Sequence, residues 1–491
     1  MERNSEDAAR RAGRRVLAGM VSREIRELAA SFRFRVTVVL TLALMVVSAA
    51  AGRSRFRAEM REHERLSEEL AGAVEGTPLA DLLREPYPVF KPPWKLAVLS
   101  DGRQRWTPDL YRSTLSVYLY PQLTRHRDAE PGLAREPLDW AFVIRVIISM
   151  AAFALGYDAV CGKKQRAMLE MVLSYPVMCW QVVTAKLVAV WACVSAPFVF
   201  GAVISLLILS AYGGIRFSAA ELVKSGLLIL IGLWAGAFFA AVALWVSLRA
   251  REPARSLAVL VLLWVTAVVA IPGAGGLLAQ TVLPLPTDQE ITRRILAISR
   301  AVEKERGGPG GLRDPANIAA GGHATERATA ATQNHRYRLQ EEERRQRVLD
   351  ELAQVELAHS LSSASPMFLI QDMAERLVGS GPLRDRSFVE QAWDFGDSLA
   401  ARVVELDDRD PESPRLWAGR ERRSPVRLLP DFVARRPVGP GDLPSFAFRE
   451  RSLREGLRAA TIRVLLFALF TAAVLILLRA AARSFEVGRP G

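Results

Sequence analysis

One short stretch of the chain has residue types that could bind a nucleotide. It reads Gly156-Tyr-Asp-Ala-Val-Cys-Gly162-Lys163-Lys164. A phosphate-binding loop has the form G-x-x-x-x-G-K-[ST], in which backbone amides surround the phosphates and the last hydroxyl holds magnesium. Here five residues separate the glycines, and Lys164 stands where the hydroxyl is required. The stretch also follows an apolar segment rather than a strand. We therefore expect no nucleotide site here, and any ATPase that drives this protein is a separate chain.

Catalytic and metal-binding patterns are missing from the sequence. Its three cysteines and five histidines form neither a C-x-x-C nor an H-x-x-x-H pair, and no G-x-S-x-G motif occurs. We predict no catalytic residue, no metal site, no cofactor and no enzymatic activity of the chain itself.

Arg145 is a charge inside an apolar segment. An ionisable residue within a membrane span is a candidate functional residue. Arg145 is also close enough to the end of its segment for its side chain to extend to the membrane surface. Both interpretations stay open on the sequence.

The composition indicates alternating membrane and aqueous segments. The 491 residues are 50% hydrophobic and 24% charged, with a net charge of +13. A basic protein could bind nucleic acid. Arginines that flank apolar spans explain the charge better, because they set topology and contact anionic lipid. We expect the lipid bilayer, and no nucleic acid, as a partner.

Six apolar stretches are long enough to cross a bilayer. They are residues 36–52, 140–156, 182–212, 222–248, 256–282 and 462–478. The fold class is therefore an α-helical polytopic membrane protein with six transmembrane helices. Pro272 and the glycines after it are expected to bend or end the fifth span.

Charge bias gives the orientation. Short basic loops follow the second and fourth spans, and the N-terminal segment 1–35 and the tail 479–491 are also rich in arginine. With six spans all four lie on one side, which the positive-inside rule makes cytoplasmic. We expect a bacterial inner-membrane protein with both termini in the cytoplasm.

Two long extracytoplasmic insertions follow from this topology. Residues 53–139 contain 14 basic and 14 acidic residues, a neutrality that suits translocation. Residues 284–458 begin with charged helical sequence in which Val348, Leu352 and Val355 recur at helical spacing. The second insertion is expected to be mainly helical, and either insertion could meet a periplasmic partner.

The N-terminal segment has an apolar stripe before the first span. Leu17, Val21, Ile25, Leu28 and Phe32 recur at helical spacing. We favour an amphipathic helix in the cytoplasmic membrane interface over a soluble helix packed on the loops.

Residues 157–181 form a basic bridge between two spans. The bridge fits a plain cytoplasmic loop, a basic amphipathic helix resting on lipid, or an element that presents its charges to a partner. Composition alone does not choose among the three.

Several motifs resemble those of the ABC-2 type permease family. They are Phe153-Ala-Leu-Gly-Tyr-Asp158, Gly162, Leu169, Leu173-Ser-Tyr-Pro176 and Lys186, followed later by Leu361-Ser-Ser-Ala-Ser-Pro366, 388–395 and 442–446. The order of the motifs covers about residues 15–488 and is most similar to the subgroup linked to multicopper or nitrous-oxide-reductase maturation and to gliding machinery, whose members carry a large outer domain. The chain departs from the family in its bridge, where Lys163 and Lys164 replace acidic sequence.

The resemblance implies a permease subunit that couples ATP hydrolysis by a dimeric ABC ATPase to substrate export. A second permease subunit, the same or paralogous, would complete the pathway. The bridge would be a coupling helix, and the residues expected to contact the ATPase are Asp158, Lys163, Lys164, Arg166 and Glu170. The alternative is an ATP-driven mechanical or envelope-assembly protein that moves no substrate through its spans.

Overall fold

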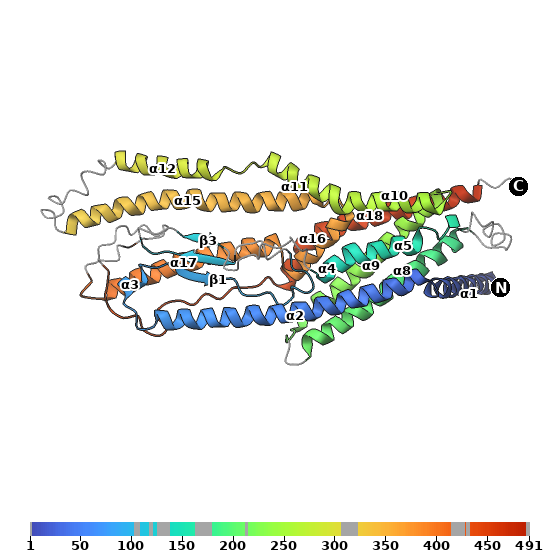
Figure 1. Ribbon diagram of the computed structural model, residues 1–491, viewed down its shortest axis with the longest axis horizontal. Helices are drawn as coiled ribbons and strands as arrows, with labels where there is room; N and C mark the ends of the chain where they lie inside the picture. The colour runs from blue at the N-terminus through green and yellow to red at the C-terminus, as the bar shows by residue number, and fades with distance from the viewer. Residues whose placement is uncertain are drawn as a thin grey trace.

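The computed structural model describes residues 2–102, 109–116, 121–124, 138–162, 179–211, 215–305, 323–413, 428 and 433–487. The molecule is elongated (Figure 1), with a helical bundle at one end and a mixed region of helices and short strands at the other. Both termini lie at the free end of the bundle. The predominance of long apolar helices confirms the α-helical polytopic class.

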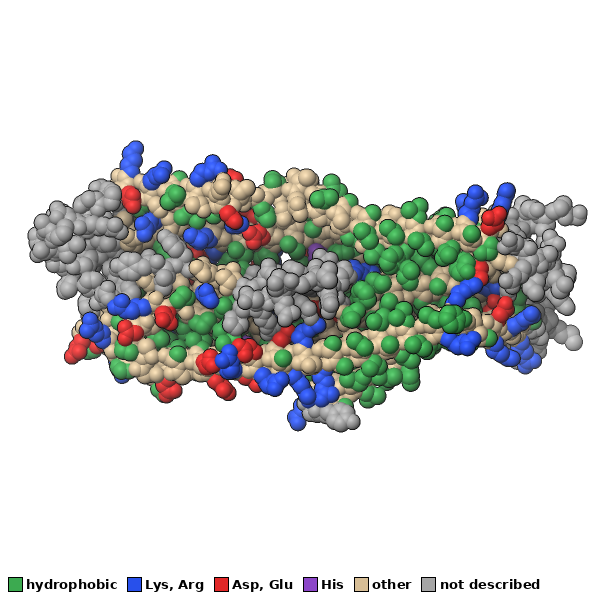
Figure 2. Space-filling view, in the orientation of Figure 1, with side chains coloured by type: hydrophobic (Ala, Val, Ile, Leu, Met, Phe, Trp, Pro, Cys, Tyr) green, Lys and Arg blue, Asp and Glu red, His purple; other side chains and the backbone are tan. Residues whose placement is uncertain are grey.

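Five helices of the described chain are long and apolar enough to cross a membrane. They are α2 (Phe32–Val74), α8 (Cys179–Ser210), α9 (Ala219–Arg249), the continuous helix Pro253–Val282, and α18 (Leu453–Val487). Hydrophobic side chains cover most of this half of the visible face (Figure 2), whereas charged side chains are scattered over the other half. These helices coincide with five of the six predicted spans.

The remaining predicted span, residues 140–156, is shorter and lies inside the bundle. It consists of α4 (Trp140–Phe142), the π-helical turn η2 (Val143–Ile148) and α5 (Ser149–Gly156). At 1.5 Å per residue it is about 26 Å long, slightly less than the apolar core of a bilayer. Trp140 is fully buried, and its Nε1 donates to Ser205 Oγ on α8 at 3.0 Å. The segment is therefore held by protein contacts rather than by lipid.

The fifth span contains a backbone carbonyl whose hydrogen-bond donor comes from another segment of the chain. Its parts are α10 (Pro253–Val265), the π-helical turn η3 (Thr266–Ala270) and α11 (Ile271–Val282). In a π-turn the carbonyl of Ala267 would accept from residue 272, but Pro272 has no N–H. Ser365 Oγ donates to this carbonyl at 2.5 Å instead. The helix thus continues through the proline, because another segment satisfies the carbonyl that the proline leaves without a donor.

Helix α2 continues beyond the apolar stretch and carries the chain into the outer region. The first insertion then adds a short helix and a three-stranded antiparallel sheet in the order β1-β2-β3. These elements are α3 (Leu79–Leu82), β1 (Tyr87–Phe90), β2 (Leu110–Ser113) and β3 (Gln122–Thr124).

The two insertions share one hydrophobic core, which we call the outer body. Val89 and Tyr111 of the sheet pack with Phe388 and Leu399 of α17 (Pro382–Arg409), and all four are buried. Polar contacts also join the insertions, since Arg384 NH2 donates to the backbone carbonyl of Pro92 at 2.9 Å. The insertions are therefore one folding unit, although some 260 residues separate the sheet from α17 in the sequence.

Two helices run alongside the outer body and form what we call the outer arm (Figure 1). They are α12 (Asp288–Glu305) and α15 (His323–Ser362), and α15 contains the predicted charged helix. Gln340 Nε2 donates to Ser299 Oγ at 2.8 Å between them. The arm contacts the outer body through the Arg345–Asp397 ion pair at 3.1 Å. At its base, α15 leads into α16 (Pro366–Val378).

Candidate functional site

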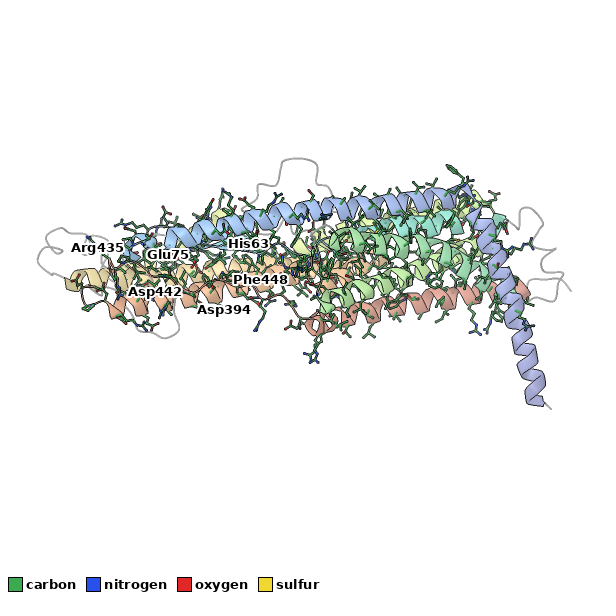
Figure 3. All side chains as sticks on the ribbon, turned by 90° about the horizontal axis from the view of Figure 1, so that it is seen from below. His63, Glu75, Asp394, Arg435, Asp442 and Phe448 are labelled. Carbon is green, nitrogen blue, oxygen red and sulfur yellow. The ribbon has the colours of Figure 1, made fainter. Side chains whose placement is uncertain are left out.

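Helix α1 (Glu2–Ala29) crosses the free end of the bundle (Figure 3). The change of direction is fixed at Ser31, which accepts from Phe34 N at 3.2 Å as the N-cap of α2 and donates to Leu28 O at 2.6 Å. Ile25 and Leu28 of the predicted stripe pack against the bundle core. Phe32 belongs to α2 instead and is 73% exposed.

A buried ion pair attaches α1 to the bundle. Lys186 Nζ on α8 donates to both carboxylate oxygens of Glu24, each at 2.9 Å. The side chain of Lys186 is 3% exposed and that of Glu24 is 18% exposed. Removing one partner of a buried pair leaves a charge without compensation, which is strongly destabilising. This pair therefore fixes where α1 sits against α8.

A second ion pair joins the start of α2 to the start of the bridge. Arg33 NH2 donates to Asp158 Oδ2 at 2.9 Å, NH1 reaches Ala154 O at 3.3 Å, and the guanidinium lies 4.8 Å from the Tyr157 ring centre. Both charged side chains are about one-third to two-fifths exposed, at 43% and 32%. An exposed pair of this kind contributes about 0–1 kcal/mol, so it orients the bridge more than it stabilises it.

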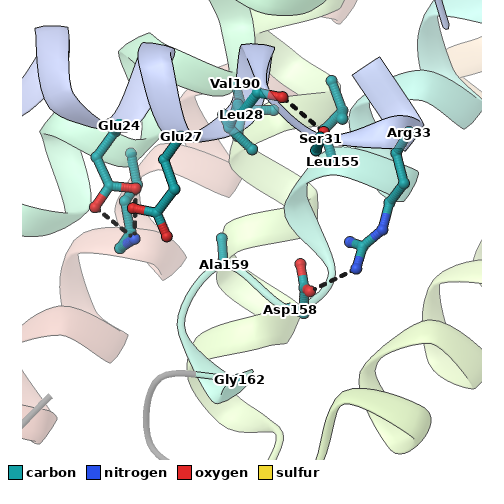
Figure 4. A pocket seen from close by; sticks show the side chains of 11 residues that line it. Glu24, Glu27, Leu28, Ser31, Arg33, Leu155, Asp158, Ala159, Gly162 and Val190 are labelled. Atoms are coloured by element: carbon teal, nitrogen blue, oxygen red, sulfur yellow. Dashed lines mark hydrogen bonds and ion pairs between the residues drawn. The ribbon is translucent and has the colours of Figure 1, made fainter. Parts of the chain in front are cut away.

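The two ion pairs border one cavity, which we call the α1 pocket (Figure 4). Its volume is about 310 Å³. Its lining residues are Glu24, Glu27, Leu28, Ser31, Arg33, Leu155, Asp158, Ala159, Gly162, Lys186 and Val190. The lining carries three carboxylates and two cations and draws on α1, α2, α5 and α8. A movement of α1 or of the bridge would therefore act on several spans at once.

The predicted site residues fall in three places. Asp158 lines the α1 pocket. Lys163, Lys164, Arg166 and Glu170 lie outside the described residues. Arg145 sits in η2 with a relative exposure of 6%, about 20 Å along the helical segment from Asp158. Arg145 is thus buried in protein rather than extended to a lipid surface, and it does not contribute to the pocket.

Sequence reasoning missed Glu24 and Arg33 as pocket residues. A signal for Glu24 was present, because a lysine that falls within an apolar span needs an acidic partner. Glu24 also lies on the helix directly before the first span. No comparable signal pointed to Arg33, which looked like one of several arginines flanking that span.

The fold and the pocket define a class: a multi-pass helical membrane protein whose N-terminal helix is ion-paired to its spans. A family model described as ABC-2 family transporter protein matches residues 24–406, well over half of the chain. The match starts at the pocket residue Glu24. No curated protein matches the sequence. The chain belongs to the ABC-2 transporter family, whose members are membrane components that associate with an ABC ATPase subunit.

Proposed function

We propose that this chain is the membrane-spanning subunit of an ABC transporter and couples ATP hydrolysis in a separate ATPase dimer to substrate export across the inner membrane. The observation that supports this most is the α1 pocket, where Glu24–Lys186 and Arg33–Asp158 link the N-terminal helix to α8 and to the start of the bridge. In this proposal the pocket faces the cytoplasm, with both termini on the same side.

The coupling step follows from these contacts. The ATPase engages the bridge, with Lys163, Lys164, Arg166 and Glu170 supplying the charged surface and Asp158 anchoring the start of the bridge to Arg33. Closing of the ATPase dimer displaces the bridge, and the ion pairs pass that displacement to α2 and α8. Nucleotide shifts the population of transporter states only as far as these contacts differ between the states.

A second candidate function is mechanical transmission to the envelope without transport. The continuity of α2 favours it, because one uninterrupted helix begins at the α1 pocket and ends beside the outer body. A second permease subunit, the same or paralogous, and a periplasmic partner fit either candidate. The two functions differ in whether a substrate crosses, so ATP-dependent substrate movement into sealed vesicles containing the complex separates them.

The test of ATPase docking is a charge reversal in the bridge. Lys163→Glu with Lys164→Glu should reduce co-purification of the ATPase at least several-fold, because the docking surface changes sign. Arg251→Glu with Arg255→Glu is the matched control, since both arginines are exposed, one just before α10 and one in its first turn. Unchanged co-purification of the bridge variant, or equal loss in the control, would contradict the docking role of the bridge.

A further inference from the structure

Three elements meet at the base of the outer arm around a partly buried histidine. His359 belongs to α15, and its Nδ1 lies 3.6 Å from Asp372 Oδ1 and 3.8 Å from Glu375 Oε2, both on α16. The carboxylate side chains are each 2% exposed and the imidazole is 17% exposed. The imidazole also packs edge-on against Phe368 of α16, with ring centres 5.2 Å apart. His359 is therefore the side chain through which the arm meets a buried acidic pair.

The same cluster includes the last span. Arg463 of α18 donates to Asp372 Oδ2 at 2.8 Å, and Arg376 of α16 donates to Asp372 Oδ1 at 2.9 Å. Arg376 also donates to Glu356 of α15 at 2.6 Å. On the far side, Glu375 is close enough to interact electrostatically with Asp139, the residue before α4. The charged groups that face His359 thus come from α15, α16 and α18.

The charges of the described cluster balance only when the imidazole is protonated. Three carboxylates, Glu356, Asp372 and Glu375, face two guanidiniums, Arg376 and Arg463. With neutral His359 the cluster holds one excess negative charge in a place poorly reached by water. One proton on the imidazole removes that excess and turns two close contacts into ion pairs.

A metal ion is a weaker occupant than a proton. His359, Asp372 and Glu375 each offer a ligand atom, and these atoms lie within 4.8 Å of one another. Both oxygens of Asp372 already accept from Arg376 and Arg463, however. A divalent ion would have to share this carboxylate with two guanidiniums and would leave the cluster with excess positive charge.

The environment favours the protonated imidazole. Burial alone lowers the pKa of His359, but the carboxylates of Asp372, Glu375 and Glu356 outweigh burial and raise this pKa above its usual 6.5. Burial raises the pKa of Asp372, yet His359, Arg376 and Arg463 together lower it to about 2. Asp372 therefore stays ionised at any pH at which His359 titrates.

We propose that His359 is a proton-operated clasp that holds the base of the outer arm against α16 and, through Asp372 and Arg463, against the last span. When the imidazole is protonated, the arm, α16 and α18 are bound into one unit. When the proton leaves, the excess negative charge weakens the contact between α15 and α16. That the clasp responds to the extracytoplasmic pH rests on the proposed topology; the clasp itself does not.

The sign of the pH effect follows from the direction of the pKa shift. A histidine whose pKa is raised by folding stabilises the folded state fully below its unfolded pKa, and this contribution is lost as the pH rises through the folded pKa. The clasp is therefore closed in mild acid and opens with a midpoint above 6.5.

The test uses the full chain in nanodiscs without ATPase or substrate, so its outcome is independent of the proposed function. Spin labels are attached at Leu296→Cys on the arm and at Arg386→Cys on α17. Pulsed electron paramagnetic resonance then measures the distance between the two labels. Both positions are exposed. The distance distribution should be narrow near pH 5.5 and broader or longer near about pH 8.5. His359→Gln should give the broad distribution at both values.

His335→Gln is the matched control, because His335 lies on the same helix and its nearest described carboxylate, Glu305, is 4.0 Å away and 70% exposed. This variant should keep the wild-type pH response. Glu375→Gln leaves two carboxylates against two guanidiniums when His359 is neutral, so it should give a narrow distribution at both pH values. A pH-independent distribution in the wild type, or a wild-type response in His359→Gln, would overturn the proposal. So would a chelator that mimics His359→Gln at acid pH, because the occupant would then be a metal ion.

Discussion

The buried pair between Glu24 and Lys186 makes an asymmetric prediction about stability. Glu24→Gln removes the carboxylate and leaves an ammonium whose side chain is 3% exposed. Lys186→Met removes the ammonium and leaves a carboxylate on α1 that is 18% exposed and can reach water. A charge that stays buried without its partner costs more than one that can be hydrated. Glu24→Gln should therefore be the more damaging of the two changes.

The magnitudes follow from the same exposures. Loss of one partner from a buried pair costs about 3–5 kcal/mol when the remaining charge stays buried, and Glu24→Gln is this case because the Lys186 side chain is 3% exposed. For Lys186→Met the partial exposure of Glu24 reduces the cost to about 1–2 kcal/mol. The double variant removes both charges of the pair together and should be within about 1 kcal/mol of the wild type. The double-mutant cycle should then give an interaction energy of at least about 3 kcal/mol.

Unfolding of the purified protein by denaturant titration in mild detergent measures all four forms of the cycle. Additive effects of the two substitutions, or a greater loss in Lys186→Met than in Glu24→Gln, would refute the reasoning. Either result would mean that the two groups do not form a desolvated pair. A lowered slope of the titration in any variant would have to be excluded first, because it indicates a change in compactness rather than stability.

Two further predictions concern packing and helix continuity. Gly156→Ala should destabilise the bundle by about 1–3 kcal/mol, because the new Cβ would lie 2.6 Å from Ala243 Cβ. Gly226→Ala, where a Cβ meets nothing within 4 Å, should be neutral or stabilising in the same thermal-unfolding assay. Ser365→Ala should cost about 2–4 kcal/mol, because it removes the N-cap of α16 and the donor to the Ala267 carbonyl together. Ser398→Ala, at an exposed position on α17, should change the thermal unfolding midpoint little. Equal effects of the two serine variants would contradict the stabilising role of the hydrogen bond from Ser365 to the Ala267 carbonyl.

Local sequence was sufficient to predict the membrane helices. An apolar run of span length needs no distant contact to be helical in a bilayer, since every backbone group is satisfied within the helix. The predicted segments 222–248 and 256–282 accordingly coincide with α9 and Pro253–Val282. Hydropathy gave less information where a helix leaves the membrane. Residues 53–74 continue α2 with pairs such as Arg65–Glu69, which stabilise a helix without being apolar.

The pairing of distant charges was harder to predict. Glu24 and Lys186 are 162 residues apart, and Arg33 and Asp158 are 125 apart. Many acidic residues could have matched Lys186, and only the folded chain selects one. The break at Pro272 shows the same limit. The sequence predicted that Pro272 bends or ends the span. The helix does not end there, because Ser365, far along the chain, supplies the missing donor.

The position of a close packing contact on helix α2 determines how a movement at one end of the helix relates to a movement at the other. Its 43 residues make a rod of about 64 Å, and Gly52 stands near the middle. A Cβ at Gly52 would lie 2.1 Å from Val98 Cγ2, so α2 packs closely on Val98 at that point. A helix that pivots at its centre moves its two ends by equal amounts in opposite directions. A tilt of about 5° would move Phe32 and Val74 in opposite directions by about 3 Å each, and displacement at one end reaches the other without amplification or loss.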